Sequence, residues 1–424
     1  MKDFVTADHM TLFGRPLWRA HKEKPRLLHT IAKWKIACSM EYNPSNVNHV
    51  FAALSSRLCL DVCMEGSEAI ALAREAVNSH LRILNIERDT ISLGQDKKSL
   101  ERMVTMTPSE PIVAEVVADL LCQTSGDIYN WTASITTLAD NLLSRRLIEK
   151  GMKGELFARL LCILARDFHH MRLGKDSMEF PYAQPFSVRD FLKSLLGDQS
   201  LEKIMAYTPN KPNTRMWRNS ETASFKNAFN GGNMNFTHFT STRLQLGVSM
   251  SDLLHSLLHQ QAALQLAFGQ PAWDILIPVY YGNLTEEFNP ARASAILIQV
   301  KNRDRPFPFS LEEHLHHYTS FFHTNDPILY ILMNLGTSDN VVEVRGLPRA
   351  LAPKLPKNSA LLKQHLFGIH LAGVDGTFAC LQDPRLLMAS KKLLETVILK
   401  DDTPEILKNH DRQCQFNRRF NSHS

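Results

Sequence analysis

The sequence lacks the cysteine pattern of a disulfide-stapled or zinc-binding protein. Its 424 residues contain seven cysteines, an odd and scattered set with no Cys-x-x-Cys pair. A disulfide framework or a zinc ribbon requires closely spaced pairs, so neither is expected. Cys59 and Cys63 are four residues apart with no histidine nearby, and we interpret them as core residues. A reducing compartment follows, and we expect an intracellular location, in the nucleus or the cytoplasm.

The sequence also lacks segments that direct a chain to a membrane. The first residues, Met1 to His9, have no apolar core of the kind that a signal peptide needs. No run of about 18 uncharged apolar residues occurs. We therefore expect no membrane partner.

A phosphate-binding loop of the Walker type is absent as well. The nearest match, Gly151-Met-Lys-Gly154, does not continue into the Gly-Lys-Ser/Thr end that cradles phosphates. The net charge of +5 is compatible with a polyanionic partner but does not identify one. With 44% hydrophobic and 21% charged residues the composition is globular, and the length suits two or three domains of about 150 residues.

The most informative stretch runs from Trp273 to Arg303. Two apolar runs flank a polar connection containing Gly and Pro, which predicts two buried strands at 273–281 and 294–302. Side chains alternate in a strand, so residues 296, 298 and 300 should share one face and residues 295, 297, 299 and 301 the other. Gln299 and Lys301 then point the same way. Asp274 is an acid in an apolar strand, a costly position unless it is paired or binds a metal.

An acid at one strand, a loop of some twenty residues and then Asp/Glu/Gln-x-Lys on the next strand resembles the PD-(D/E)XK, or restriction-endonuclease-like, nuclease core. The matching residues are Asp274 and Gln299-Val300-Lys301. Together with the segment from Asn233 to Phe239, the stretch is also similar to the nuclease-like C-terminal part of Crinkler-type fungal proteins. The resemblance implies metal-dependent phosphodiester hydrolysis of DNA or RNA, and a separate ATPase domain or chain as partner.

Site residues follow from the same resemblance. Asp274 and Gln299 would hold Mg²⁺ or Mn²⁺ through hard oxygen ligands, and Asp252 is a further candidate ligand. Lys301 would act on the nucleophile or the phosphate. Arg303 and Arg305 form a basic rim suited to backbone phosphates, although solvated loop charges are an equal alternative.

The sequence departs from the nuclease pattern at two positions. Gln299 replaces the usual acid, which leaves one carboxylate where most members have two. Pro278 falls inside the first strand and predicts an edge position or a bulge, because proline donates no ladder hydrogen bond.

Other functions remain open. A degenerate nuclease-like domain would bind nucleic acid without cutting it, and a protein-interaction module would use the helical region instead. Asp274 and Asp252 have simpler roles as caps of a turn and of a helix. His255 and His259 have the spacing of zinc ligands but lack the glutamate of His-Glu-x-x-His, and the adjacent pair His169-His170 suits a structural role.

We predict a restriction-endonuclease-like α/β C-terminal domain, with a mixed sheet flanked by helices, preceded by an all-helical domain. The boundaries are 1–205 for the helical domain, 206–235 for a linker, 236–400 for the nuclease-like domain and 401–424 for a basic tail. The expected helices are 67–84, 111–121, 131–148, 155–171, 187–197, 249–268, 310–322 and 386–398. The remaining expected strands are 236–244, 328–335 and 366–374.

Overall fold

The computed structural model describes most of the chain. The described residues are 2–39, 41–60, 83–93, 96–106, 108–143, 153–174, 179–208, 224–241, 249–266, 273–302, 309, 326–346 and 366–394. Arg303, Arg305, the predicted helix 310–322 and the predicted tail 401–424 lie outside them.

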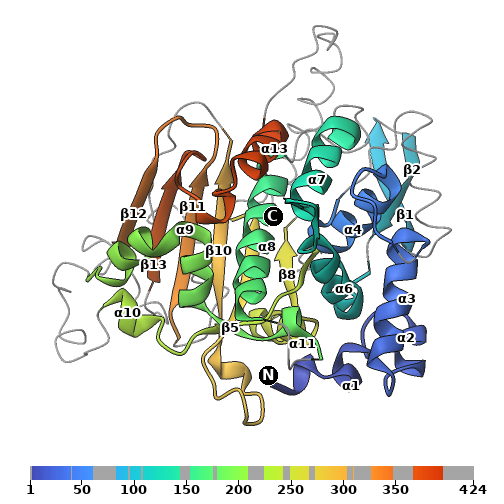
Figure 1. Cartoon of the computed structure of the whole chain (residues 1–424), viewed down its shortest axis with the longest axis horizontal. Coiled ribbons are helices and arrows are strands. Elements are labelled where there is room, and N and C mark those ends of the chain that lie inside the picture. Colours follow the sequence, from blue (N-terminus) through green and yellow to red (C-terminus); the bar gives the residue numbers. More distant parts are fainter. Residues whose placement is uncertain are drawn as a thin grey trace, which may run out of the picture.

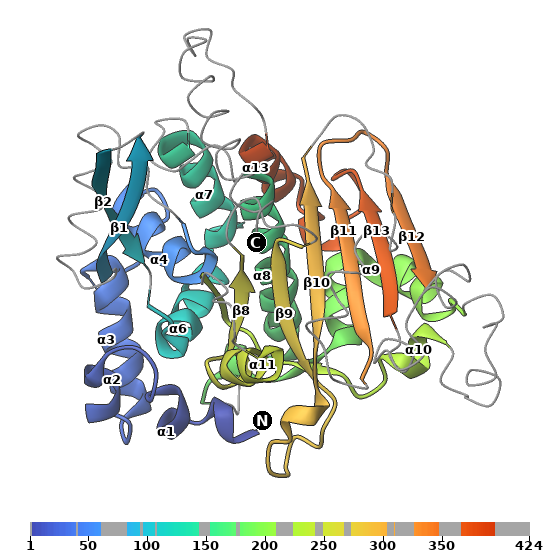
Figure 2. The same ribbon diagram turned by 180° about the vertical axis from the view of Figure 1, so that it is seen from behind.

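A nine-stranded mixed sheet runs through the molecule in the order β12-β13-β11-β10-β9-β6-β5, with β8 beside β9 and β7 beside β8 (Figure 2). Strands β10, β11 and β13 are parallel, and β9 and β12 run antiparallel to them. The α/β prediction is confirmed at this level, and each of the predicted strands at 273–281, 294–302, 328–335 and 366–374 contains an observed one. The bounds are β5 Phe186–Ser187, β6 Asn233–Met234, β7 His238–Ser241, β8 Ala262–Gln265, β9 Ile275–Tyr280, β10 Ala293–Lys301, β11 Ile328–Asn334, β12 Val341–Gly346 and β13 Leu366–Ala372.

Helices cover the sheet and extend beyond one end of it (Figure 1). Proline at the first or second position opens α2, α3 and α6, where its missing N–H has no helical partner to lose. None of the described helices is long and apolar enough to cross a bilayer. The bounds are α1 Ala7–Met10, α2 Pro16–Ala20, α3 Pro25–Ala37, α4 Val47–Leu58, α6 Pro111–Leu121, α7 Asn130–Thr137, α8 Lys153–Leu173, α9 Val188–Met205, α10 Phe225–Ala228, α11 Met250–His259 and α13 Pro384–Leu394.

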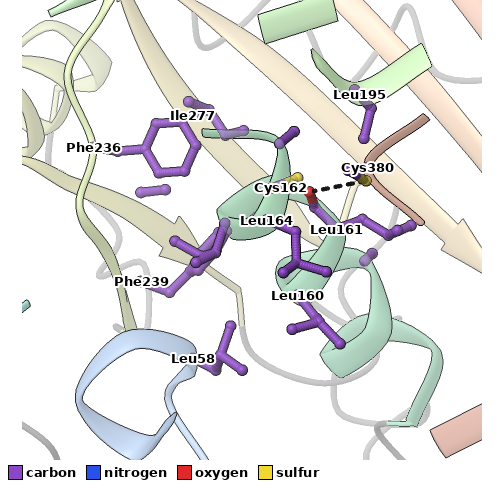
Figure 3. Close-up of a cluster of buried hydrophobic side chains, with 14 of the residues drawn as sticks. Leu58, Leu160, Leu161, Cys162, Leu164, Leu195, Phe236, Phe239, Ile277 and Cys380 are labelled. Atoms are coloured by element: carbon purple, nitrogen blue, oxygen red, sulfur yellow. Dashed lines mark hydrogen bonds between the residues drawn. The ribbon is translucent and has the colours of Figure 1, made fainter. Parts of the chain in front are cut away.

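Helix α8 lies at the centre of the main core. Its side chains from Leu156 to Ala165 are buried almost without exception, as a helix that is apolar on all sides should be. Figure 3 shows Leu160, Cys162 and Leu164 between α4, the sheet and the segment that holds Cys380, whose thiol donates to the Leu161 carbonyl at 3.9 Å. This core is continuous from the N-terminal helices to one face of the sheet.

The two faces of the sheet bury different sets of residues, as the alternation predicted. Ile296, Ile298 and Val300 join the α8 core, whereas Ala295 and Leu297 join a second core beneath α11. Strand β9 divides in the same way, since its odd-numbered residues join the α8 core and Leu276 and Tyr280 join the other. Helix α11 therefore packs on the face that carries Gln299 and Lys301.

The predicted helix 249–268 is too long. Helix α11 begins after its N-cap Ser249, as predicted, but ends at His259, and Gln261 adopts a left-handed conformation with φ 51°. Residues 262–265 form β8 between β7 and β9. Short apolar runs fit a helix face and a buried strand equally well, and pairing on both sides favoured the strand here.

An all-helical region before the nuclease-like part is not confirmed. The hairpin β1 Ile83–Leu93 and β2 Asp96–Met106, the short pair β3 Thr124–Ser125 and β4 Ile128–Tyr129, and strand β5 all lie there. Most of the predicted helix 67–84 lies outside the described residues. The capping box at Ser187 is confirmed, but the helix kinks at Gly197 (φ 82°) and continues to Met205. The division at 206–235 stays a prediction; α10 and β6 lie within that range.

Pro278 lies at neither an edge nor a bulge. It pairs with Ala295 of β10 inside β9, which has neighbours on both sides. On its other side β9 pairs with β8 through residues 275 and 276 and with β6 through residues 279 and 280. Pro278 therefore occupies the gap where β9 changes partner, so the missing N–H costs little.

Candidate functional site

The candidate site lies where β9 begins and β10 ends, at one end of these two interior strands of the sheet. Asp274 directly precedes β9, and the two strands are antiparallel, so it lies beside the end of β10. Its amide donates to the Ile298 carbonyl at 2.8 Å, and its own carbonyl accepts from the Leu266 amide at 2.9 Å. Bonds on both sides thus fix the backbone of Asp274.

The Asp274 carboxylate is held against β10. Its Oδ2 accepts a hydrogen bond of 2.7 Å from the Val300 amide. Burial raises the pKa of Asp274, while the Val300 amide and the positive charge of Lys301 act to lower it. Amide bonding and a nearby cation both favour the ionised form, which suits a carboxylate that acts as a ligand or electrostatic group.

Gln299 is buried and already engaged. Only 6% of it is exposed, and its Oε1 accepts a hydrogen bond of 2.7 Å from the hydroxyl of Tyr330 on β11. An amide oxygen has two lone pairs, so this bond leaves one acceptor position on Gln299. The sequence-based prediction missed Tyr330. Its place on the same face of β11 as Ile328 and Leu332 was the available signal.

The register extends the polar row across the sheet. Lys301 pairs with Asn334 of β11, and Leu332 of the same strand pairs with His370 of β13. The Asn334 amide Nδ2 lies 2.7 Å from His370 Nε2. An amide nitrogen only donates, so His370 Nε2 accepts and its proton resides on Nδ1, which lies 4.0 Å from a Glu343 carboxylate oxygen.

Burial lowers the pKa of His370 and favours its neutral form, although Glu343 acts to raise this pKa. The Phe309 ring stacks on His370 with centroids 5.5 Å apart. Arg345 closes the row, with its Nε 2.8 Å from Glu343 and its guanidinium over the Phe309 ring. The row from Asp274 to Arg345 thus contains as many acids as cations.

Asp252, the further candidate ligand, lies on α11, which packs on the face of the sheet that carries Gln299 and Lys301. It is exposed in the first turn of α11, and its amide donates to the Ser249 hydroxyl at 3.1 Å. This position at the start of a helix suits the alternative role of Asp252 as a helix cap. The predicted phosphate contacts Arg303 and Arg305 lie outside the described residues.

The histidine pairs of the sequence have structural neighbours. His255 stacks on Phe288 at 4.7 Å, and His259 accepts through its carbonyl a hydrogen bond of 2.9 Å from His9 Nε2. His170 is buried with its ring edge-on to Phe186. Across the described residues, no group of three or more His, Cys, Asp or Glu side chains is arranged to hold a metal ion.

A divalent cation at this site would have few ligands from the chain. Asp274 and Gln299 both offer oxygen, the donor that Mg²⁺ prefers, and Mg²⁺ sites usually keep several waters. Each of these oxygens already accepts one hydrogen bond and retains a further lone pair. The donor chemistry therefore fits Mg²⁺ or Mn²⁺, with a single negative charge to offset dehydration.

Comparison with protein families gives one match. A family model described as "Domain of unknown function (DUF8736)" matches residues 43–336, which is more than half of the chain. The matched range contains Asp274, Gln299, Lys301 and Asn334, and it excludes α1–α3 and His370. No curated protein and no solved structure matches.

Proposed function

We propose that this chain, which belongs to the family described as Domain of unknown function (DUF8736), hydrolyses phosphodiester bonds of nucleic acid through a divalent metal site at Asp274 and Gln299. One observation carries the proposal. Asp274, which precedes Gln299 and Lys301 by about 25 residues in the sequence, lies beside the end of the strand that carries them, and these are the three residues that match the nuclease motif.

The order of elements supports a PD-(D/E)XK-like fold. Helix α11 is followed by β8, β9 and β10 as successive antiparallel neighbours and then by β11, parallel to β10. These strands are compatible with the order that the resemblance implies. Residues 262–265 of β8 were predicted as helix, and the helix predicted between β10 and β11, at 310–322, lies outside the described residues. The similarity to Crinkler-type proteins rests on the stretch from Trp273 to Arg303 together with residues 233–239, which contain β6 and the start of β7.

Each side chain has a role in the proposed reaction. A bound divalent cation would neutralise charge on the scissile phosphate and acidify a water. Asp274 supplies the negative charge that holds such a cation, and the Val300 amide keeps its carboxylate in place. Tyr330 orients the Gln299 carbonyl, and the Lys301 ammonium offsets the negative charge that develops on phosphate. Arg303 and Arg305 are the proposed phosphate contacts beside them.

A second candidate function is binding of nucleic acid without cleavage. The Tyr330–Gln299 hydrogen bond favours it, because it occupies part of the only other ligand that the motif provides. The third possibility, a protein-interaction module built on the N-terminal helices, predicts no nucleic-acid binding at all.

Cleavage tests the first candidate. The full chain is incubated with single- and double-stranded DNA and RNA in Mg²⁺, Mn²⁺ or EDTA. We expect slow, metal-dependent cleavage, with Mn²⁺ at least as effective because it tolerates imperfect geometry better. Asp274→Ala should abolish cleavage, and Lys301→Ala should slow it about a hundred-fold, as for other groups that stabilise developing charge.

Glu287→Ala is the matched control, because it removes an exposed acid from the loop at the other end of β9 and β10 and should leave cleavage unchanged. Thermal unfolding of each variant establishes that the fold persists. Cleavage that survives Asp274→Ala would contradict the site assignment. Binding that persists without cleavage in any metal would favour the second candidate, and the absence of both would favour the third.

A further inference from the structure

The positive charge of the chain is concentrated in one short segment. Residues 15–35 contain seven lysines and arginines and a single acid, Glu23. Their net charge of +6 exceeds the +5 of the whole chain, so the remaining residues are close to neutral. The segment forms α2, the turn after it and nearly all of α3.

Several of these cations have no counterion among the described residues. Arg15 pairs with Glu110 at 3.0 Å, and Lys22 pairs with Asp8. In the part of the chain that the structure describes, no carboxylate lies within ion-pair distance of the remaining charges on the outer side of the segment. These are Arg19, Lys24, Arg26 and Lys33.

The outer face of α3 mixes cations with exposed apolar groups. At 100° per residue, positions 26, 27, 30, 33 and 34 fall within an arc of about 120°. Trp34 is 52% exposed and Leu27 37% exposed on this arc, beside Arg26 and Lys33. Large apolar side chains exposed next to uncompensated charge indicate an interaction surface.

We propose that this surface, formed by Arg19, Lys24, Arg26, Lys33 and Trp34, binds single-stranded nucleic acid. The cations contact backbone phosphates, and one base stacks on the Trp34 indole. Basic grooves with aromatic stacking platforms are the common solution for single strands, because every base has a flat face and every nucleotide a negative charge. A duplex keeps its bases stacked on one another and offers none to the indole.

A membrane surface fits less well. An interfacial helix buries a wide apolar face in the lipid. The apolar face of α3, formed by Leu28, Ala32 and Ile36, is already buried in the main core. Leu27 and Trp34 alone do not replace it.

The surface is separate from the candidate site. Figures 1 and 2 show α2 and α3 at the end of the molecule opposite β12, with α4, α6 and β8 between them and β10. The segment also precedes the range that the family model matches. The inference therefore goes beyond the proposed hydrolysis, and binding here does not require that the site at Asp274 cleaves.

Fluorescence anisotropy of labelled oligo(dT), with the full chain in EDTA, tests the proposal without any metal chemistry. Trp34→Ala should weaken binding about ten-fold, in line with the loss of one stacked base, and Trp34→Phe should recover most of it. Arg26→Ala/Lys33→Ala should reduce the salt slope of log affinity by about 1.4, which is the effect of two single-strand phosphate contacts. In a Trp217→Phe background, quenching of indole emission on binding should disappear in Trp34→Ala, because Trp18, Trp131 and Trp273 are buried.

Lys203→Ala/Lys226→Ala is the charge-matched control, since it removes two exposed cations, one on α9 and one on α10. It should leave both affinity and slope unchanged. Equal losses in the control and the α3 variant would overturn the proposal, as would tighter binding of duplex. Retention on phosphatidylserine vesicles or polyglutamate through the same residues, without oligo(dT) binding, would overturn it in favour of a lipid or an acidic protein. Loss of cleavage in Asp274→Ala with unchanged oligo(dT) binding would separate the two functions.

Discussion

Replacing Gln299 by Glu restores the acid that the nuclease pattern expects, at a buried position opposite Asp274. Ile298 pairs with Ile275, so the next position of β10 lies opposite Asp274. Gln299 is 6% exposed, so the new carboxylate would be buried beside an existing one. Like charges opposite each other in a sheet destabilise it, and a shared metal ion would relieve the repulsion.

The expected magnitude follows from these contacts. Without metal, burial and repulsion should cost about 1–3 kcal/mol, because the Tyr330 hydroxyl and the Lys301 charge offset part of the penalty. At about 2–4 °C per kcal/mol, the Tm should fall by about 2–12 °C in EDTA. A metal ion at a hundred times its Kd would return about 2.7 kcal/mol, enough to cancel most of the loss.

Thermal unfolding in EDTA and in a Mn²⁺ series measures both quantities. The wild type should respond weakly to Mn²⁺, Gln299→Glu strongly, and the double variant Asp274→Asn/Gln299→Glu weakly again. Cleavage by Gln299→Glu should exceed that of the wild type if the site is a weakened nuclease. An equal loss of stability with and without metal would refute the idea that these two positions share an ion.

Two further predictions concern stability. Asp167→Asn should destabilise the protein by about 3–5 kcal/mol in urea unfolding, because it removes the buried charge that Arg57 binds with two bonds of 3.1 and 2.8 Å and Arg166 with a third of 2.6 Å; a loss below about 1 kcal/mol would contradict this. Burial, together with neighbouring histidines, lowers the pKa of His259 to about 4, and burial also lowers that of His9. Their neutral forms therefore stabilise the folded state above pH 6.5, and urea unfolding should show stability falling as the pH drops from 6.5 towards 4, less steeply in His259→Gln.

The strand pair at the site was predictable because its signal is local. Residues 293–301 alternate between two apolar faces over nine positions, and a period of two assigns both faces at once. Strand β12 was missed although Val341, Val342 and Val344 favour a strand. It is a six-residue edge strand with two charged side chains, so its apolar pattern is weaker than that of the buried strands. No strand is predicted over residues 83–106, where the hairpin β1–β2 lies. Its register pairs Glu87 with Arg102 and Arg88 with Glu101, so complementary charge was the available signal.

The partners of the site residues were not predictable in the same way. Tyr330 lies 31 positions after Gln299, and His370 lies 36 positions after Asn334. Their contacts arise because β11 is inserted between β10 and β13, an order that no local periodicity determines. The sequence therefore identified residues with suitable chemistry, whereas the strand order decided which of their oxygens already accept hydrogen bonds.

The distribution of charge bears on how substrate would reach such a site. The row across the sheet balances Asp274 and Glu343 against Lys301 and Arg345, so the described part of the site has no net attraction for a polyanion. The excess charge lies instead on α2 and α3, at the opposite end of the molecule. Affinity for nucleic acid and the chemistry on it would then belong to different surfaces. Neutralising α3 should lower affinity across sequences and leave the rate of bound substrate unchanged, whereas Asp274→Ala should do the reverse.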